Sequence, residues 1–141
     1  MIGTSLLVVV LLLTLAAIFF NKSSEGYKLD KKVAYSVYLA TLVTIVTAAY
    51  LIYLFLSDQF QYVYVWSYSS QNLDVVYKIT GLWAGQQGSF LLWLLIHTVV
   101  GSIIVWRKSM NKASFNTYMV LQAMLLVLLF YKNPFEIAQT V

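Results

Sequence analysis

Hydrophobic residues along the chain gather in four long stretches without charge, at 1–21, 33–57, 79–106 and 113–131. The hydrocarbon core of a bilayer, about 30 Å thick, is crossed by roughly 20 helical residues. We therefore predict an all-α fold, an integral membrane bundle of four transmembrane helices at about 2–20, 33–56, 89–106 and 113–131. These helices form a single domain over 1–141, with an outer aromatic loop at 57–88.

The first apolar stretch has the position of a secretory signal peptide, but its details favour a retained helix. No basic residue precedes the apolar run, and the run is longer than the apolar region of a signal peptide. The sequence Leu15-Ala16-Ala17-Ile18 is also a poor context for cleavage. We expect this stretch to remain as the first transmembrane helix.

The composition supports a membrane protein and removes several kinds of chemistry. Of the 141 residues, 61% are hydrophobic and only 10% are charged, whereas soluble domains carry about 25% charged residues. The chain has no cysteine, which excludes disulfides, thiolate metal sites and thiol nucleophiles on this chain. The net charge of +4 would indicate nucleic-acid binding only if the charges lay together on one surface.

The charges instead alternate between loops. Most basic residues lie in two short connections, 22–32 and 107–112, while the long connection holds only Lys78 with Asp58 and Asp74. The positive-inside rule places the two basic loops in the cytoplasm, so both termini and the aromatic loop are predicted on the outer, periplasmic side. The positive charge thus records topology, and we expect no nucleic-acid partner. Because the basic loops are short, the first and second helices should be antiparallel neighbours, as should the third and fourth.

Aromatic residues alternate along the outer loop. The four side chains recur at every second position, which places them on one side of an extended chain: Tyr62, Tyr64, Trp66 and Tyr68. One interpretation is an aromatic belt at the depth of the lipid headgroups, where Tyr and Trp are enriched. The other is a flat aromatic shelf for a planar hydrophobic ligand or a partner loop. Composition favours the belt.

A glycine-rich segment, GLWAGQQGS at 81–89, leads into the third apolar stretch. Glycines are unfavourable inside a helix, but they permit close approach of another group to the backbone. Gln86 and Gln87 supply amide donors and acceptors, and Ser89 is placed to cap the third helix. By spacing alone this segment could also be an ordinary helix entry, which is the more common case.

Polar residues inside the predicted spans are few. His97 is the one histidine, about 12 Å along the third helix from Ser89, near the bilayer midplane. It shares a helix face with Trp93 and Gly101, and the small Gly101 admits a neighbouring helix or ring. We favour a neutral histidine hydrogen-bonded within the bundle, with Gln122 as candidate partner. A second polar row lies on the second helix, where we expect hydroxyl groups to bond within the helix or to a neighbour: Thr41, Thr44 and Thr47.

The segment 77–93, YKITGLWAGQQGSFLLW, resembles the first signature of the CcmF/CycK cytochrome c biogenesis proteins. In that family an aromatic and a basic residue precede W-(G/A)-G-x-E-G-S, an aliphatic run and a tryptophan. The segment 64–70, YVWSYSS, is similar to the family's Y-V-A-x-(H/Y)-S, and Asn133-Pro134-Phe135 matches its next landmark. The order of helices also agrees, so the resemblance extends along the whole chain.

The resemblance implies the N-terminal portion of a haem lyase, which attaches haem to the Cys-x-x-Cys-His thiols of apocytochrome c. It assigns six residues to an outer haem-handling surface: Trp83, Gly85, Gln87, Gly88, Ser89 and Trp93. Haem is then a cofactor of the assembled complex and is not expected on this chain alone. No catalytic residue is assigned, no metal ligand is expected, and His97 is only a weak candidate ligand, because the family does not place its haem ligand there.

The chain departs from the family pattern in two residues and in extent. Gln87 replaces the glutamate of the signature, and Trp66 replaces a small residue. The family's tryptophan-rich segment and haem-holding histidines have no counterpart here, so both a natural split subunit and a fragment stay open. The resemblance implies partners that carry those missing segments, together with a haem chaperone and apocytochrome c thiol-handling proteins, in the cytoplasmic (inner) membrane and in contact with its lipid.

Two other functions were weighed against this one. A small four-span structural or accessory subunit of another membrane complex would use the signature merely as a helix entry. A transporter or channel is disfavoured because the four stretches contain no charged residue, and ion or proton pathways through membranes normally use such residues.

Overall fold

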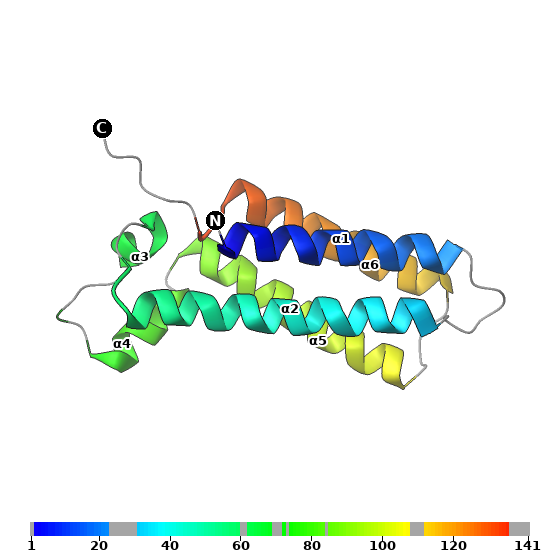
Figure 1. Ribbon diagram of the computed structural model, residues 1–141, viewed down its shortest axis with the longest axis horizontal. Helices are drawn as coiled ribbons and strands as arrows, with labels where there is room; N and C mark the ends of the chain where they lie inside the picture. Colours follow the sequence, from blue (N-terminus) through cyan, green and yellow to red (C-terminus); the bar gives the residue numbers. More distant parts are fainter. Residues whose placement is uncertain are drawn as a thin grey trace.

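The computed structural model describes residues 2–22, 31–59, 62–68, 72, 74–83, 85–107 and 112–135. Within this part of the chain, four helices are long and apolar enough to cross a membrane. They are α1 (Ile2–Lys22), α2 (Lys31–Leu56), α5 (Gln86–Trp106) and α6 (Lys112–Tyr131), as Figure 1 shows. The predicted all-α membrane fold is therefore confirmed, and each helix agrees with its predicted range to within about three residues at either end.

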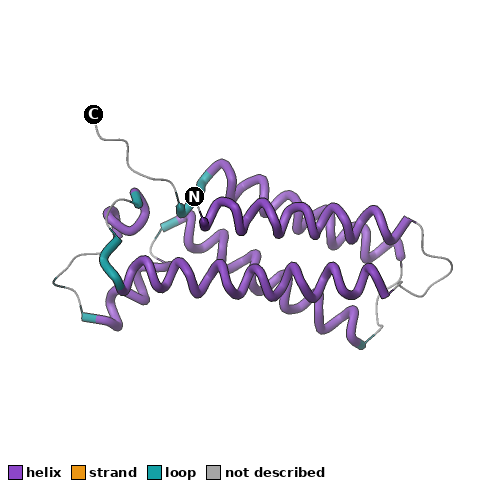
Figure 2. Tube along the Cα trace, in the orientation of Figure 1, coloured by secondary structure: helices purple, strands orange, loops and turns teal. Residues whose placement is uncertain are grey.

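The connection between α2 and α5 contains short helices where a loop was predicted. These are α3 (Val63–Tyr68), α4 (Val75–Thr80) and the 3-10 turn η1 (Gly81–Trp83). Figure 2 shows them gathered at one end of the bundle. Ala84 and parts of the two basic loops, at 23–30 and 108–111, lie outside the described residues.

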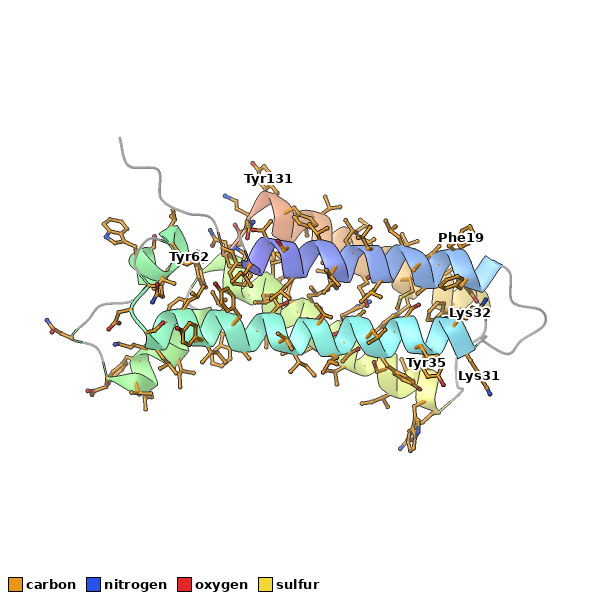
Figure 3. The ribbon with its side chains drawn as sticks, in the orientation of Figure 1. Phe19, Lys31, Lys32, Tyr35, Tyr62 and Tyr131 are labelled. Atoms are coloured by element: carbon orange, nitrogen blue, oxygen red, sulfur yellow. The ribbon has the colours of Figure 1, made fainter. Side chains whose placement is uncertain are left out.

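The four long helices form a ring in which each packs against two others. α1 contacts α2 and α6, and α5 contacts α2 and α6. The predicted pairs are confirmed, and the two remaining contacts close the bundle (Figure 1). The beginning of α1 and the end of α6 lie at the end that carries α3 and α4. Lys31 and Lys32 lie at the opposite end from Tyr62 (Figure 3). The assignment of these ends to the two sides of the membrane stays a prediction from charge.

The interior of the bundle holds two apolar clusters. The larger one includes Leu7, Leu51 and Phe55, and the smaller one, nearer the basic loops, includes Val33 and Phe115. Large apolar side chains are also exposed along the outer faces of all four helices, among them Leu12, Leu42, Ile103 and Leu121. A helix that is apolar all round is suited to a membrane, because lipid solvates its outer face.

Polar side chains in the interior bond to the backbone or to one another. The hydroxyls of Thr44 and Thr47 donate to the carbonyls four residues earlier, at 2.7 Å each. Thr41 also reaches α5, where its hydroxyl donates to the Thr98 carbonyl at 2.9 Å. The expectation for the threonine row is confirmed. Such bonds satisfy hydroxyl groups that would be costly to leave unpaired in an apolar interior.

Candidate functional site

The segment from the end of α2 to the beginning of α5 carries the residues predicted to be functional. α2 ends in a tight turn at Asp58, whose φ is 55°, a left-handed conformation in which Asp and Asn are enriched. The N–H of Gln59 donates to the Leu54 carbonyl at 3.1 Å and satisfies one of the free carbonyls at this helix end. After this turn, α4 and η1 pack against α2.

A partly buried ion pair fixes α4 to the end of α2. The Nζ of Lys78 donates to Oδ1 of Asp58 at 2.7 Å, and Lys78 is the buried residue of its short helix. This pair was not predicted from the sequence. A signal existed, because Lys78 is the single base of the long connection and Asp58 is one of its two acids.

The glycines of the signature receive aromatic rings from α3. A Cβ atom added to Gly85 would lie 2.6 Å from a ring carbon of Tyr68 and 2.7 Å from one of Tyr64. The Tyr64 hydroxyl accepts a hydrogen bond from the Gly85 N–H at 3.3 Å. At Gly81 an added Cβ would lie 2.7 Å from the Tyr68 carbonyl oxygen. The glycines therefore provide the close approach that the sequence indicated, and α3 supplies the approaching groups: aromatic rings at Gly85 and a backbone carbonyl at Gly81.

Tyr64 is the central side chain of this arrangement. It is 2% exposed, and the edge of the Phe55 ring packs against it with centroids 5.5 Å apart. Burial raises the pKa of the Tyr64 phenol, and the hydrogen bond from the Gly85 backbone offsets part of that effect. The phenol consequently stays protonated and can both donate and accept at neutral pH.

The extended chain expected for these aromatic residues is wrong. Residues 63–68 form the helix α3, in which Tyr64 is buried and Trp66 is exposed, and Tyr62, just before this helix, is also buried. An alternating pattern contains pairs four residues apart, and a helix also brings such pairs together. Tyr64 and Tyr68 are one pair, with ring centroids 5.0 Å apart. The resembling residues Ser69 and Ser70 lie outside the described part of the chain.

The beginning of α5 differs from the expectation for Ser89. The N-cap residue is Gly85, with φ −110° and ψ 170°, and the helix begins at Gln86. Ser89 lies in the first turn, where its N–H donates to the Gly85 carbonyl at 3.3 Å. Its hydroxyl reaches back to the Trp83 carbonyl at 3.4 Å. The prediction that Ser89 caps this helix is therefore wrong, because η1 brings the chain to the helix start one turn earlier.

The six residues predicted for the haem-handling surface divide by exposure. Trp83 and Trp93 are exposed, Gln87 and Ser89 are partly buried, and Gly85 and Gly88 are buried. On α5 the spacing places Ser89 and Trp93 on one stripe together with Gln86, which is also exposed. The bond from Ser89 to Trp83 brings η1 to the same stripe. We call the group Trp83, Gln86, Ser89 and Trp93 the signature face.

Gln87 lies on a different side of α5. It is one turn before the buried Leu91 and next to the buried Gly88, so it faces the bundle more than the signature face does. The family's glutamate at this position would thus be partly enclosed by protein. A neutral glutamine avoids the cost of a partly buried charge.

The Asn133-Pro134-Phe135 landmark closes this end of the bundle. The Nδ2 of Asn133 donates to the Thr4 hydroxyl on α1 at 3.0 Å, and Oδ1 of Asn133 accepts from the Phe135 N–H at 2.9 Å. The Phe135 ring is buried over Gly3 and next to the Tyr50 ring of α2. At the same end, a hydrogen bond joins the hydroxyl groups of Tyr50 and Tyr62, whose oxygens are 3.2 Å apart.

His97 is hydrogen-bonded within the bundle, but not to Gln122. Its Nε2 bonds to the Tyr118 carbonyl at 3.0 Å, the two rings stack with centroids 3.8 Å apart, and the Tyr118 hydroxyl donates to the His97 carbonyl. Gly101 makes room, since an added Cβ would lie 2.9 Å from the Tyr118 ring. Gln122 instead donates from Nε2 to the Thr14 hydroxyl at 2.7 Å. Thus the proposed partner was wrong, because Gln122 faces α1.

The hydrogen bond to the Tyr118 carbonyl makes the Nε2 of His97 unavailable as an axial ligand of haem. A carbonyl oxygen only accepts, so the Nε2 of His97 carries the proton and cannot bind iron while that bond exists. Across the described residues, no group of three His, Cys, Asp or Glu side chains is close enough to hold a metal ion. What the signature face offers is exposed indole surface beside amide and hydroxyl groups, suited to contact with a planar apolar molecule or a protein.

Comparisons with known proteins were made for sequence and for fold. No family model matches the chain. It is 28% identical over 104 residues to the cytochrome c-type biogenesis protein NrfE of Haemophilus influenzae, covering 70% of this chain and 16% of that protein. It is 42% identical over 48 residues to the cytochrome c-type biogenesis protein CycK of Rhizobium meliloti, covering 34% of this chain and 7% of that protein.

The fold is similar to a solved structure, that of the cytochrome c heme lyase CcmF. The match has a TM-score of 0.83 at 19% sequence identity, and it covers 99% of this chain and 25% of that chain. This likeness shows the fold alone. The chain spans a small part of the length of these three proteins, from 7 to 25%.

Proposed function

Because the chain is related in sequence to the cytochrome c biogenesis proteins NrfE and CycK, we propose that it is a membrane-embedded part of a CcmF-like haem lyase. In this role it supports the outer haem-handling surface and does not ligate haem itself. The observation that carries the proposal is the signature face, where Trp83 and Trp93 expose indole rings on a backbone fixed by Gly85 and Ser89.

Different residues of the segment hold it in place and form its exposed face, which supports this role. Tyr64 and the ion pair between Lys78 and Asp58 hold the segment against the bundle, and they leave the signature face free to contact haem or the remaining lyase segments. The iron ligands are supplied by those segments. The thiols that react with haem belong to apocytochrome c, which agrees with the absence of cysteine from this chain. We place the complex in the inner membrane, with this end of the bundle on the periplasmic side.

Deletion of the gene in its native host tests the coarser role. The loss of covalently haem-stained c-type cytochromes, restored by the wild-type gene, is the expected result. Affinity purification from native membranes should also recover a larger partner rich in Trp and His that carries b-type haem. Normal cytochrome levels after deletion, or recovery of the chain as a stable oligomer without such a partner, would contradict the proposal.

Paired tryptophan substitutions test the role of the signature face. Trp83→Leu with Trp93→Leu keeps an apolar surface and removes both indoles, and we expect cytochrome c yield to fall severalfold at equal membrane levels of the chain. Trp106→Leu is the matched control, since Trp106 is exposed at the other end of α5. If the double variant supports normal yield, the signature is a packing element only, and the chain is an accessory scaffold.

A further inference from the structure

The short helix α4 has its apolar and charged residues in the reverse of the usual arrangement. Its first turn is exposed, with exposed fractions of 60% for Val75, 68% for Val76 and 61% for Tyr77. The residue that follows, Lys78, is buried. A helix facing water normally turns its charged residues outward and its β-branched apolar residues inward. The exposed first turn of α4 therefore requires an apolar or amphipathic environment.

The ion pair is the cause of this orientation. Lys78 reaches inward to Asp58, at 2.7 Å, and so rotates the helix until its first turn points away from the bundle. The two charges neutralise each other on the face of α4 that points toward the bundle. At its N-terminus, α4 is preceded by Asp74, whose side chain is exposed and makes no cap hydrogen bond. The helix thus has a polar start, an apolar first turn and a charge that is satisfied internally.

The position of α4 indicates that lipid covers this turn. α4 packs against α2 and η1, and Figure 1 shows it beside the end of α2. The last turn of α2, the membrane span against which α4 packs, also exposes Tyr53 and Leu56, so exposed apolar residues occur on both neighbouring helices. Val and Tyr together suit the boundary between headgroups and acyl chains, where a tyrosine ring is buried and its hydroxyl is wet.

We propose that the first turn of α4 is an interfacial anchor: Val75, Val76 and Tyr77 insert at the headgroup boundary of the bilayer beside α2. Interfacial helices bury their apolar face roughly 5–10 Å into this region. The Lys78–Asp58 pair is the positioning element that holds the turn at this depth. The anchor is independent of the proposed function, and it applies whichever side of the membrane this end faces.

Single-cysteine labelling tests the anchor directly, because the chain contains no cysteine of its own. Val76→Cys and the control Asp74→Cys are reconstituted in phosphatidylcholine nanodiscs and treated with a charged, membrane-impermeant maleimide. We expect Val76→Cys to react about tenfold more slowly than Asp74→Cys, since insertion removes the thiol from water. Equal rates would overturn the proposal.

Lipid quenching distinguishes a bilayer from a protein cover. A bimane fluorophore on Val76→Cys should be quenched by lipids brominated near the headgroup end of the acyl chain, while the same fluorophore on Asp74→Cys should be quenched much less. Slow labelling without quenching would mean that protein, such as a second copy of this chain, covers the turn, and it would refute the lipid anchor. Adding Lys78→Met should accelerate labelling at Val76→Cys, with helicity by circular dichroism as the check that the bundle remains folded. An unchanged labelling rate in that variant would refute the positioning role of the pair.

Discussion

The ion pair between Lys78 and Asp58 should contribute measurably to the stability of the folded chain. The perturbation is a double-mutant cycle of Lys78→Met, Asp58→Asn and both together. Methionine retains an unbranched apolar side chain without the charge. Asparagine tolerates the left-handed φ of 55° at position 58, so the turn after α2 is preserved.

The expected magnitude follows from the burial of the two partners. The side chain of Lys78 is 10% exposed and that of Asp58 is 27% exposed, with the charged atoms 2.7 Å apart. Exposed pairs contribute about 0.2–1 kcal/mol, whereas breaking a fully buried pair costs about 3–5 kcal/mol. Because water still reaches Asp58, we expect a coupling free energy of about 1–3 kcal/mol, between these limits. The destabilisations by Lys78→Met and by Asp58→Asn should therefore add up to more than the destabilisation by the double variant, and the difference is the coupling free energy.

Reversible unfolding in mixed micelles of a mild detergent and dodecyl sulfate, followed by circular dichroism, measures the four free energies. Asp74→Asn is the matched control, since its exposed side chain makes no cap hydrogen bond, and its effect should stay within about 0.5 kcal/mol. A coupling free energy indistinguishable from zero would refute the reasoning. So would a coupling that disappears in moderate salt, because screening of that strength is typical of fully exposed pairs.

Three further predictions concern the glycine contact, the histidine and the polar core. Gly85→Ala should destabilise the fold by about 1–3 kcal/mol, because its Cβ would approach the Tyr64 and Tyr68 rings to 2.7 and 2.6 Å. Gln86→Ala, at the exposed position next to it, is the control, and equal unfolding free energies of the two variants would contradict the close packing. His97→Ala should leave the haem content of the purified complex unchanged, as measured by the pyridine haemochrome spectrum, whereas loss of haem would make His97 a ligand. Gln122→Leu should lower the unfolding free energy by about 0.5–2 kcal/mol in the same assay, because the Thr14 hydroxyl loses its hydrogen-bond donor at 2.7 Å. Val127→Leu, on the exposed side of α6, is the control and should lower it much less. Equal losses would refute the contribution of this hydrogen bond.

The pattern of the sequence was sufficient for the four spans and for the neighbours along the chain. A run of apolar residues long enough to cross a bilayer must satisfy its backbone groups internally, and a helix does this without reference to any other segment. The short basic loops likewise force successive helices together. The likeness of the signature was also readable, because it rests on residue types at fixed spacing between 77 and 93.

The partners of individual side chains were decided only by the tertiary structure. His97 bonds to Tyr118 of α6, whereas Gln122, one turn further along α6, bonds to Thr14 of α1. The choice depends on how α6 is rotated about its axis, and a helix with apolar residues on all sides gives little information about that rotation. The same limit applies to Lys78, whose inward direction follows from the turn at Asp58.

The low fraction of charged residues indicated a membrane protein, because so few charges cannot cover a surface in water. Which residues of the connection between α2 and α5 face outward was settled by packing across the chain. Tyr64 is enclosed by Phe55 and Gly85, and Trp66 is left exposed, although the two look alike as neighbours in an alternating pattern. Burial depends on contacts between segments that are distant in the sequence. The local pattern of residues describes only one of the two segments in each contact, so it does not determine which side chain is buried.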